Sequence, residues 1–277
     1  MNKTETLVKD KLWLFASRAH DDDHFFKMLS NVTYSKKSRI TPAEGATMLG
    51  TPNVIMVQSD GIPVPYSNDA YGYMESFCRM KNVLWSVTGS GGSRCGEEED
   101  FICTLAEKYP NVTGAFFDDF TGNSMKRLEH SPEFISDLFK KVRNTLDKAC
   151  RPMELWSTCY TNLVERFPAS MYDPLDGITI WNMATSEIPN MDADFSTYEK
   201  LLPTKRKMLG IYLFDYGKGV SVEKELMEMQ CETGLQWLKE GRIEGMVFLT
   251  NCVMGIGLES DYWLRSWIDK VGNEVLK

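Results

Sequence analysis

The sequence has no apolar run long enough to cross a bilayer, and its first residues, Met1–Leu7, lack the apolar segment of a secretory signal peptide. We therefore expect a cytoplasmic protein that does not contact a membrane. Its 31 basic and 39 acidic side chains give a net charge of −8, and the one basic cluster is Lys36–Arg39. Because phosphate binding needs a basic face, nucleic acid is not an expected partner.

Histidine is scarce, with only His20, His24 and His130, and this limits metal chemistry. His20 and His24 are four residues apart with three aspartates between them. That run is more typical of a solvated loop or a helix start than of a zinc or manganese site. The chain also lacks a GxGxxG motif after its first strand-like segment, a complete P-loop and a Ser-His-Asp set. We expect no metal and no cofactor.

The seven cysteines are scattered along the chain, and none belongs to a CxxC pair. Cys78, Cys103 and Cys231 lie inside apolar stretches. This usage predicts reduced, buried thiols rather than a disulfide framework or a thiolate metal site.

What the sequence does have is a series of short, apolar, nearly continuous segments. Such segments are typical of parallel strands that are covered on both faces. Eight of them recur along the 277 residues, at Leu12–Ser17, Asn53–Ser59, Asn82–Thr88, Gly114–Asp119, Met153–Cys159, Gly177–Asn182, Met208–Asp215 and Gly245–Asn251.

Helical patterns separate these segments. Ser131 followed by Pro132 predicts an N-cap and the first turn of one helix. The apolar stripe of that helix is expected at Phe134, Leu138, Val142 and Leu146. Other helices are expected to begin at Thr41, to run from a Ser221 cap to a C-terminal Gly241, and to cover Ser260 to about Val271.

Alternating strands and helices imply right-handed βαβ units. Eight units of roughly 30 residues each favour a closed barrel. We therefore predict a single (β/α)8 TIM barrel over residues 1–277, with an open doubly wound sheet as the alternative. In such barrels the polar residues that follow each strand are functional candidates, because the chemistry takes place at the carboxyl ends of the strands.

The fourth segment ends in two adjacent acids, Asp118 and Asp119, and the seventh ends in Asp215. Adjacent strand residues point to opposite sides, so one of Asp118 and Asp119 should face the cleft while the other caps a loop or pairs with a base. Acids on the fourth and seventh strands face each other across a barrel mouth, and glycoside cleavage needs such a pair of carboxyl groups. We take these three as the candidate catalytic residues. Their alternative roles are turn caps and, for Asp215, an ion pair with Lys218.

Other residues near the strand ends are candidates for substrate binding. Arg18 could bind a carboxylate, hold Asp118 or Asp119 ionised, or form an ordinary ion pair at the rim. The glycine-rich run 88–94 could cradle a phosphate with the help of Arg94, or form an active-site loop. Aromatic rings could line a sugar platform, and we expect two of Tyr160, Trp181, Tyr212 and Trp263 to touch the cleft. The full set is Arg18, Asp60, Arg94, Tyr160, Trp181, Asn182, Tyr212, Asn251, Glu259 and Trp263.

Residues 114–120, Gly-Ala-Phe-Phe-Asp-Asp-Phe, resemble the fourth-strand signature of TIM-barrel glycoside-hydrolase-like proteins, in which this strand ends in a catalytic acid. Residues 209–217 and 241–249 are similar to uncharacterised bacterial proteins of that broad kind. Well-known retaining members carry glutamates at the ends of strands four and seven, and chitinase-like members space their acids on alternate residues. Here the acids are aspartates, and two of them are adjacent.

The leading hypothesis is therefore an enzyme, a glycosidase-like hydrolase that binds a small-molecule carbohydrate. A sugar isomerase or epimerase is the second, and it would usually need a metal cluster at the rim. The third is a carbohydrate-binding barrel that kept the fold and lost the chemistry.

Overall fold

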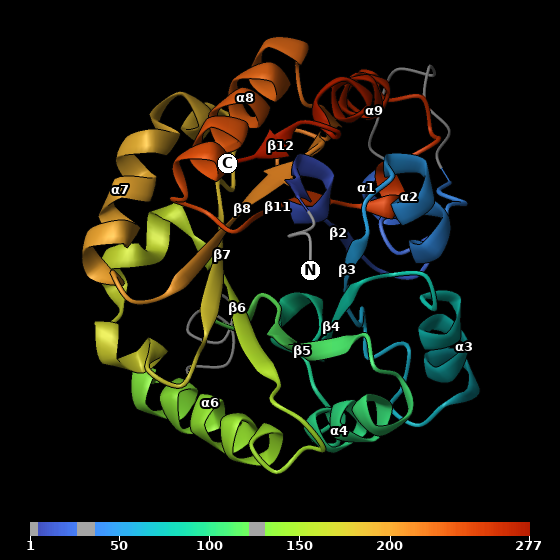
Figure 1. Ribbon diagram of the computed structural model, residues 1–277, viewed down its shortest axis with the longest axis vertical. Helices are drawn as coiled ribbons and strands as arrows, with labels where there is room; N and C mark the ends of the chain where they lie inside the picture. Colours follow the sequence, from blue (N-terminus) through green and yellow to red (C-terminus); the bar gives the residue numbers. More distant parts are fainter. Residues whose placement is uncertain (1–4, 27–36, 122–130) are drawn as a thin grey trace.

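The computed structural model describes residues 5–26, 37–121 and 131–277. Met1–Thr4, Lys36 and His130, which entered the predictions, lie outside these ranges. Eight parallel strands close into a barrel in the order β11-β2-β3-β4-β5-β6-β7-β8, and the helices surround it (Figure 1). The barrel strands are β2 (Leu12–Ala16), β3 (Asn53–Met56), β4 (Asn82–Thr88), β5 (Val112–Phe117), β6 (Glu154–Tyr160), β7 (Gly177–Trp181), β8 (Arg206–Tyr212) and β11 (Gly245–Leu249).

The prediction of a (β/α)8 TIM barrel is confirmed, and the sheet is closed rather than open. Each of the eight predicted segments overlaps one barrel strand. Six strands end one to three residues earlier than predicted, and two of these changes concern the candidate acids: the fourth ends at Phe117 instead of Asp119, and the seventh ends at Tyr212 instead of Asp215. Asp215 lies instead in a small antiparallel hairpin that follows the barrel strand.

The remaining elements connect the barrel strands or flank the barrel. The helices are α1 (Asp23–Phe26), α2 (Pro42–Leu49), α3 (Asn68–Ser76), α4 (Glu98–Lys108), α6 (Pro132–Leu146), α7 (Met191–Leu201), α8 (Lys224–Glu240) and α9 (Glu259–Val271). The 3-10 turns are η1 (Val8–Lys11), η2 (Ser90–Gly92), η3 (Thr161–Arg166), η4 (Ala169–Tyr172), η5 (Thr185–Asn190) and η6 (Asn251–Val253). The short strands are β1 (Thr6–Leu7), which pairs with β12 (Val275–Leu276), and β9 (Phe214–Asp215), which pairs with β10 (Val220–Ser221).

The predicted helix caps are mostly confirmed. The Thr41 side chain accepts a hydrogen bond from the Glu44 N–H, and the Glu44 carboxylate reaches back to Thr41, which completes a capping box at the start of α2. The Ser131 side chain caps α6 by accepting a hydrogen bond from the Phe134 N–H. Gly241 ends α8 in the left-handed conformation.

Two helix predictions are wrong in detail. The buried stripe of α6 is Ile135, Phe139, Val142 and Leu146, while Phe134 is largely exposed, because the helix is rotated relative to the predicted face. The N-cap of α8 is Glu223 rather than Ser221. Ser221 belongs to β10, where its hydroxyl donates to Ser260.

Aromatic rings packed on glycines fill the barrel interior. Trp181 of β7 is in register with Gly210 of β8, and a Cβ at Gly210 would lie 2.0 Å from the indole ring. Trp156 of β6 has the same relation to Gly177 of β7, where a Cβ would lie 2.3 Å from the ring. Neighbouring strands therefore alternate a large and an absent side chain, which lets the rings lie across the barrel axis.

Phe15 connects non-neighbouring strands through the centre of the barrel. Its ring makes edge contacts with Phe116 of β5 at 6.1 Å and with Trp181 of β7 at 5.7 Å between centroids. Because β2, β5 and β7 are not adjacent, these rings must all point inward. Phe117, one residue further on, points outward and packs on Phe139 of α6.

All seven cysteines are free, but the expectation that they are buried holds only in part. Cys231 is buried and Cys103 is partly buried, whereas Cys78 is exposed at the end of α3. The apolar stretch around Cys78 is a helix terminus, so only part of it faces the core. Across the three described ranges, none of the helices combines the length and apolarity that a bilayer crossing needs.

We expect Gly210→Ala to lower the free energy of unfolding by about 1–3 kcal/mol, because the added methyl group overlaps the Trp181 ring in a close-packed interior. Gly72→Ala is the matched control. Gly72 lies in α3 with nothing within 4 Å of its Cβ position, so alanine should be neutral or stabilising by up to about 1 kcal/mol. Urea unfolding of both variants measures the difference, and a Gly210→Ala protein as stable as the wild type would contradict the packing.

Candidate active site at the carboxyl-terminal mouth of the barrel

Asp118 is the acid that points into the barrel. It is two residues beyond the inward-facing Phe116, and strand alternation puts both on the same side. Its carboxyl accepts a hydrogen bond from the Thr158 hydroxyl of β6 at 3.3 Å, and the residue is only 5% exposed. Burial, followed by the neighbouring charge of Asp119, raises the pKa of the Asp118 carboxyl well above its usual range.

Asp119 breaks the strand alternation because its backbone has a positive φ of 49°. Its carboxylate accepts a hydrogen bond from the Tyr160 hydroxyl of β6, and another from the Gly91 N–H at 3.3 Å. Aspartate tolerates this left-handed conformation better than most residues. Asp119 therefore joins the same mouth as Asp118, and it is also the acid that caps a loop.

Tyr160, Trp181 and Tyr212 form an aromatic wall at the ends of β6, β7 and β8. Tyr160 and Tyr212 lie beside the two acids, whereas Trp181 is only 1% exposed and packs on Tyr212. The Trp181 and Tyr212 rings are 5.2 Å apart. Burial raises the pKa of the Tyr212 hydroxyl, with a further increase from Asp119, while the neighbouring Tyr160 hydroxyl acts in the opposite direction. Burial is also the main reason that the pKa of Tyr160 is raised, followed by the charges of Tyr212 and Asp119. The structure thus brings four predicted site residues, Asp118, Asp119, Tyr160 and Tyr212, into one electrostatic unit.

Asp215 is engaged by two loops. Its carboxylate accepts hydrogen bonds from the Thr185 hydroxyl at 2.7 Å and the Lys218 N–H at 2.9 Å, and the Lys218 ammonium lies 3.7 Å away. Burial opposes its ionisation, but these donors and the lysine charge together lower the pKa of Asp215. Among the residues that the structure describes, neither Asp118 nor Asp119 hydrogen-bonds to it. These contacts match the ion pair and loop cap weighed as the alternative.

Arg18 forms an ion pair at the rim rather than a contact with Asp118 or Asp119. Its guanidinium lies 2.6 Å from Asp21 and 3.8 Å from Asp60. The Asp60 side chain is 85% exposed in a turn after β3. The hydrogen bond from Arg18 to Asp21 raises the pKa of the guanidinium, so Arg18 stays fully charged.

The glycine-rich run supports Asp119. Its Gly91 N–H is one of the two donors to that carboxylate, and Gly91 and Gly92 both adopt positive φ, which glycine tolerates. Arg94 is directed to two buried glutamates, with Glu99 at 2.6 Å and Glu98 at 3.6 Å. With its charge neutralised by these carboxylates, Arg94 is poorly placed for the predicted phosphate cradle.

The other predicted binding residues lie apart from Asp118 and Asp119 or make contacts that support the fold. Asn251 is fully buried, and its amide bonds the Ser17 and Ile40 backbones, so it joins β11 to β2. Glu259 is exposed in the first turn of α9, and Trp263 stacks on Trp267 of the same helix. Asn182 is nearly buried after β7, and its amide nitrogen has no hydrogen-bond partner among the described residues.

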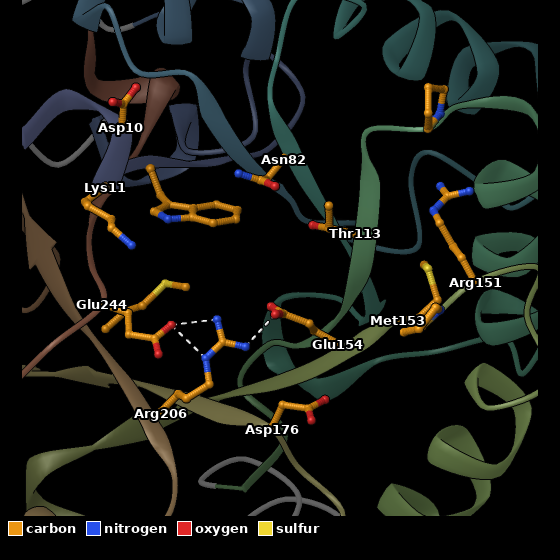
Figure 2. A pocket seen from close by; sticks show the side chains of 14 residues that line it. Asp10, Lys11, Asn82, Thr113, Arg151, Met153, Glu154, Asp176, Arg206 and Glu244 are labelled. Carbon is orange, nitrogen blue, oxygen red and sulfur yellow. Dashed lines mark hydrogen bonds and ion pairs between the residues drawn. The ribbon is translucent and has the colours of Figure 1, made fainter. Parts of the chain in front are cut away.

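The opposite end of the barrel holds a cavity of about 510 Å³, lined by residues at the starts of the strands (Figure 2). Arg206 lies between Glu154 and Glu244 there, pairs with both, and stacks on the Trp156 ring at 5.0 Å. Polar residues at the amino-terminal end of such barrels serve stability, whereas chemistry lies at the carboxyl-terminal end. We therefore assign this cavity to the fold.

Two features of the mouth were not predicted. One is a pair of threonines: the Thr158 hydroxyl donates to the Asp118 carboxyl, and the Thr88 hydroxyl donates to the Asp118 backbone carbonyl. Thr158 could have been found from the sequence, because it lies two residues before Tyr160 and so faces the same side of β6. The other is Asp22, which was seen only as part of an acidic run and bonds Tyr216 at the rim. Within the described ranges, no three His, Cys, Asp or Glu side chains are grouped as metal ligands.

No protein-family model matches this chain, and no curated protein matches it either. Solved structures match along nearly its full length. The GH99 endo-alpha-mannosidase from Bacteroides thetaiotaomicron has 11% identity, a TM-score of 0.56, and 96% of this chain and 98% of its own covered. A chitinase from the same organism has 11% identity, a TM-score of 0.56 and 96% of each chain covered.

Other chemistry occurs on the same fold. An aldolase matches with 8% identity, a TM-score of 0.50, and 94% of this chain and 98% of its own covered. Identities this low show the fold alone. The resemblance to TIM-barrel glycoside-hydrolase-like proteins is confirmed at that level.

We expect Asp118 to make stability fall with rising pH. An unfolded aspartate loses its proton near pH 3.9, whereas the folded pKa is raised, so the folded state binds the extra proton between these two values. Stability from this group is complete below about pH 4 and is lost as the pH rises through the folded pKa. Asp118→Asn cannot ionise, so the wild type should lose stability relative to this variant over that window.

Urea unfolding of both proteins between pH 4 and 9 measures this difference. The control is Asp137→Asn, at a side chain that is 76% exposed, which should change stability by less than about 0.5 kcal/mol at each pH. A difference in stability between the wild type and Asp118→Asn that does not change with pH would contradict the raised pKa of Asp118.

Proposed function

We propose that this protein is a glycosidase-like hydrolase whose reaction takes place at the carboxyl-terminal mouth of the barrel. The observation that carries the proposal is the juxtaposition of Asp118 and Asp119 with the aromatic wall of Tyr160, Trp181 and Tyr212. Carboxyl groups supply the acid, base or nucleophile of glycoside cleavage, and the partly exposed Tyr212 ring offers a sugar an apolar face. The likeness of the fold to an endo-alpha-mannosidase and a chitinase supports this reading.

The two acids divide the work because their surroundings differ. Asp118 is buried, and burial together with the charge of Asp119 raises its pKa, which favours the protonated form. Asp119 receives hydrogen bonds from the Tyr160 hydroxyl and the Gly91 N–H, donors that stabilise a carboxylate. Asp119 is the group that attacks the anomeric carbon or activates water, and Asp118 positions it. Like charges this close cannot both ionise easily, so the raised pKa of Asp118 favours Asp119 as the ionised group of the two.

Asp215 enters this proposal as an anchor. Its oxygens are already occupied by Thr185 and Lys218, so it holds the loops after β7 and β8 beside the aromatic wall. The engagement of Asp215 also favours a second candidate function, a carbohydrate-binding barrel without chemistry. Asp215 was one of the two acids expected to face each other across the mouth, and its contacts leave it unsuited to catalysis.

We expect Asp119→Asn to lower kcat/KM by about 10²–10⁴-fold on a substrate that the wild type hydrolyses, which is the range for loss of a general acid or base. Asp118→Asn should cause a comparable loss. Asp215→Asn should cost less than about tenfold in activity and lower the melting temperature, since it weakens two loop contacts. Asp137→Asn is the control.

The assay is the release of reducing sugar and of aryl leaving groups from a panel of glycosides. Losses below about tenfold for both Asp118→Asn and Asp119→Asn would reject the assignment. Sugar binding by calorimetry without turnover of any glycoside would favour the carbohydrate-binding barrel.

A further inference from the structure

A third carboxyl group, Asp22, lies at the rim of the mouth on the side of β2. It belongs to the loop between β2 and α1, and its Oδ2 accepts a hydrogen bond from the Tyr216 hydroxyl at 2.7 Å. Tyr216 follows β9 and therefore comes from the loop beyond β8. Two segments far apart in sequence thus meet over the mouth.

Three tyrosines connect Asp22 with Asp119. The Tyr216 and Tyr212 rings are 6.0 Å apart in an edge contact, Tyr212 interacts with Tyr160, and the Tyr160 hydroxyl donates to Asp119. We call Tyr160, Tyr212 and Tyr216 the tyrosine arc. Its tyrosines come from the ends of β6 and β8 and from the loop after β9. The acids at its two ends, Asp22 and Asp119, follow β2 and β5.

The partners of Asp22 differ from those of its neighbours. Asp21 is paired with Arg18 at 2.6 Å, and Asp23 accepts the Ser38 N–H at 2.8 Å. The side-chain partner of Asp22 is a neutral phenol. Among the described residues Asp22 has no Lys or Arg ion-pair partner, and such a carboxyl can carry the proton that a proton donor requires.

We propose that Asp22 is the second carboxyl group of the mouth and donates a proton to the leaving oxygen of the glycoside, opposite Asp119. This inference rests on the proposed function. As the bond between the anomeric carbon and the leaving oxygen breaks, the Asp22 proton moves to that oxygen. Water forms the new bond to the anomeric carbon, and Asp119 takes the proton that this water releases. β2 and β5 are three places apart in the ring of eight strands, so the two carboxyl groups come from different sides of the mouth.

The electrostatics agree with this role. Burial, partly offset by the Tyr216 hydrogen bond and increased by the charge of Asp21, raises the pKa of Asp22 to about 6. The other ionisable groups that face it are Asp23 and His24 from its own segment and Cys252 from η6. A donor must be protonated, so kcat/KM should fall as the pH rises through about 6. Tyr216→Phe removes a hydrogen bond that lowers the pKa, so this limb should move to higher pH.

The test compares two leaving groups in the wild type, Asp22→Asn and Asp137→Asn. A sugar or methyl leaving group needs protonation, whereas a dinitrophenolate does not. Asp22→Asn should lose about 10²-fold or more on the first kind of substrate and less than about tenfold on the second. A merely structural aspartate would lower both rates equally.

Equal losses on both substrates, or losses below about tenfold on both, would overturn the role of Asp22 while leaving the proposed function intact. If Asp22→Asn does not fold, the pH profile of kcat/KM for Tyr216→Phe decides. A fall in kcat/KM that moves to higher pH supports the proposal, and a fall at the wild-type pH overturns it. A wild type that hydrolyses no glycoside overturns both proposals together.

Discussion

The packing of tryptophan on glycine in the barrel interior is the constraint on which the rest of the structure depends. Trp181 occupies the space that a side chain at Gly210 would need, and Trp156 does the same at Gly177. A one-residue slip of a strand would turn each ring out of the barrel, so this fit holds the register. That register in turn puts Tyr160 and Tyr212 at the ends of their strands, facing Asp118.

The two ends of the barrel treat their carboxylates differently. At the amino-terminal end Glu154 and Glu244 have Arg206 between them, so their charges are neutralised locally (Figure 2). At the mouth the donors to Asp118, Asp119 and Asp22 are hydroxyls and one backbone N–H. Neutral donors satisfy the hydrogen bonds of a carboxyl group without adding a positive charge that would hold it ionised. The pKa values of these three acids therefore depend mainly on burial and on neighbouring carboxyl charges. Other acids at the mouth are paired with cations, Asp215 with Lys218 and Asp21 with Arg18, so the contrast holds for Asp118, Asp119 and Asp22.

Much of the fold could be predicted from residue pattern, because a strand covered on both faces leaves a continuous apolar run. The eight runs, the Thr41 capping box and the Gly241 terminus all follow from short-range rules. The face of α6 was harder, since Phe134 and Ile135 are equally apolar and only the neighbouring helices distinguish them. At the site, the acids were predictable from their places after strands, but Thr158 was found only through its contact with Asp118.

The sequence by itself determined the barrel and the order in which acids and aromatic residues follow its strands, because local periodicity and the carboxyl ends of parallel strands set both. Only the tertiary structure decided which partners surround each acid. Asp119 reaches the mouth through a positive φ, Asp215 is held by the loop after β7, and Asp22 meets Tyr216 across a distance in sequence that no pattern spans. The physical reason is that a carboxyl group takes its character from the donors around it, and loop conformation chooses those donors.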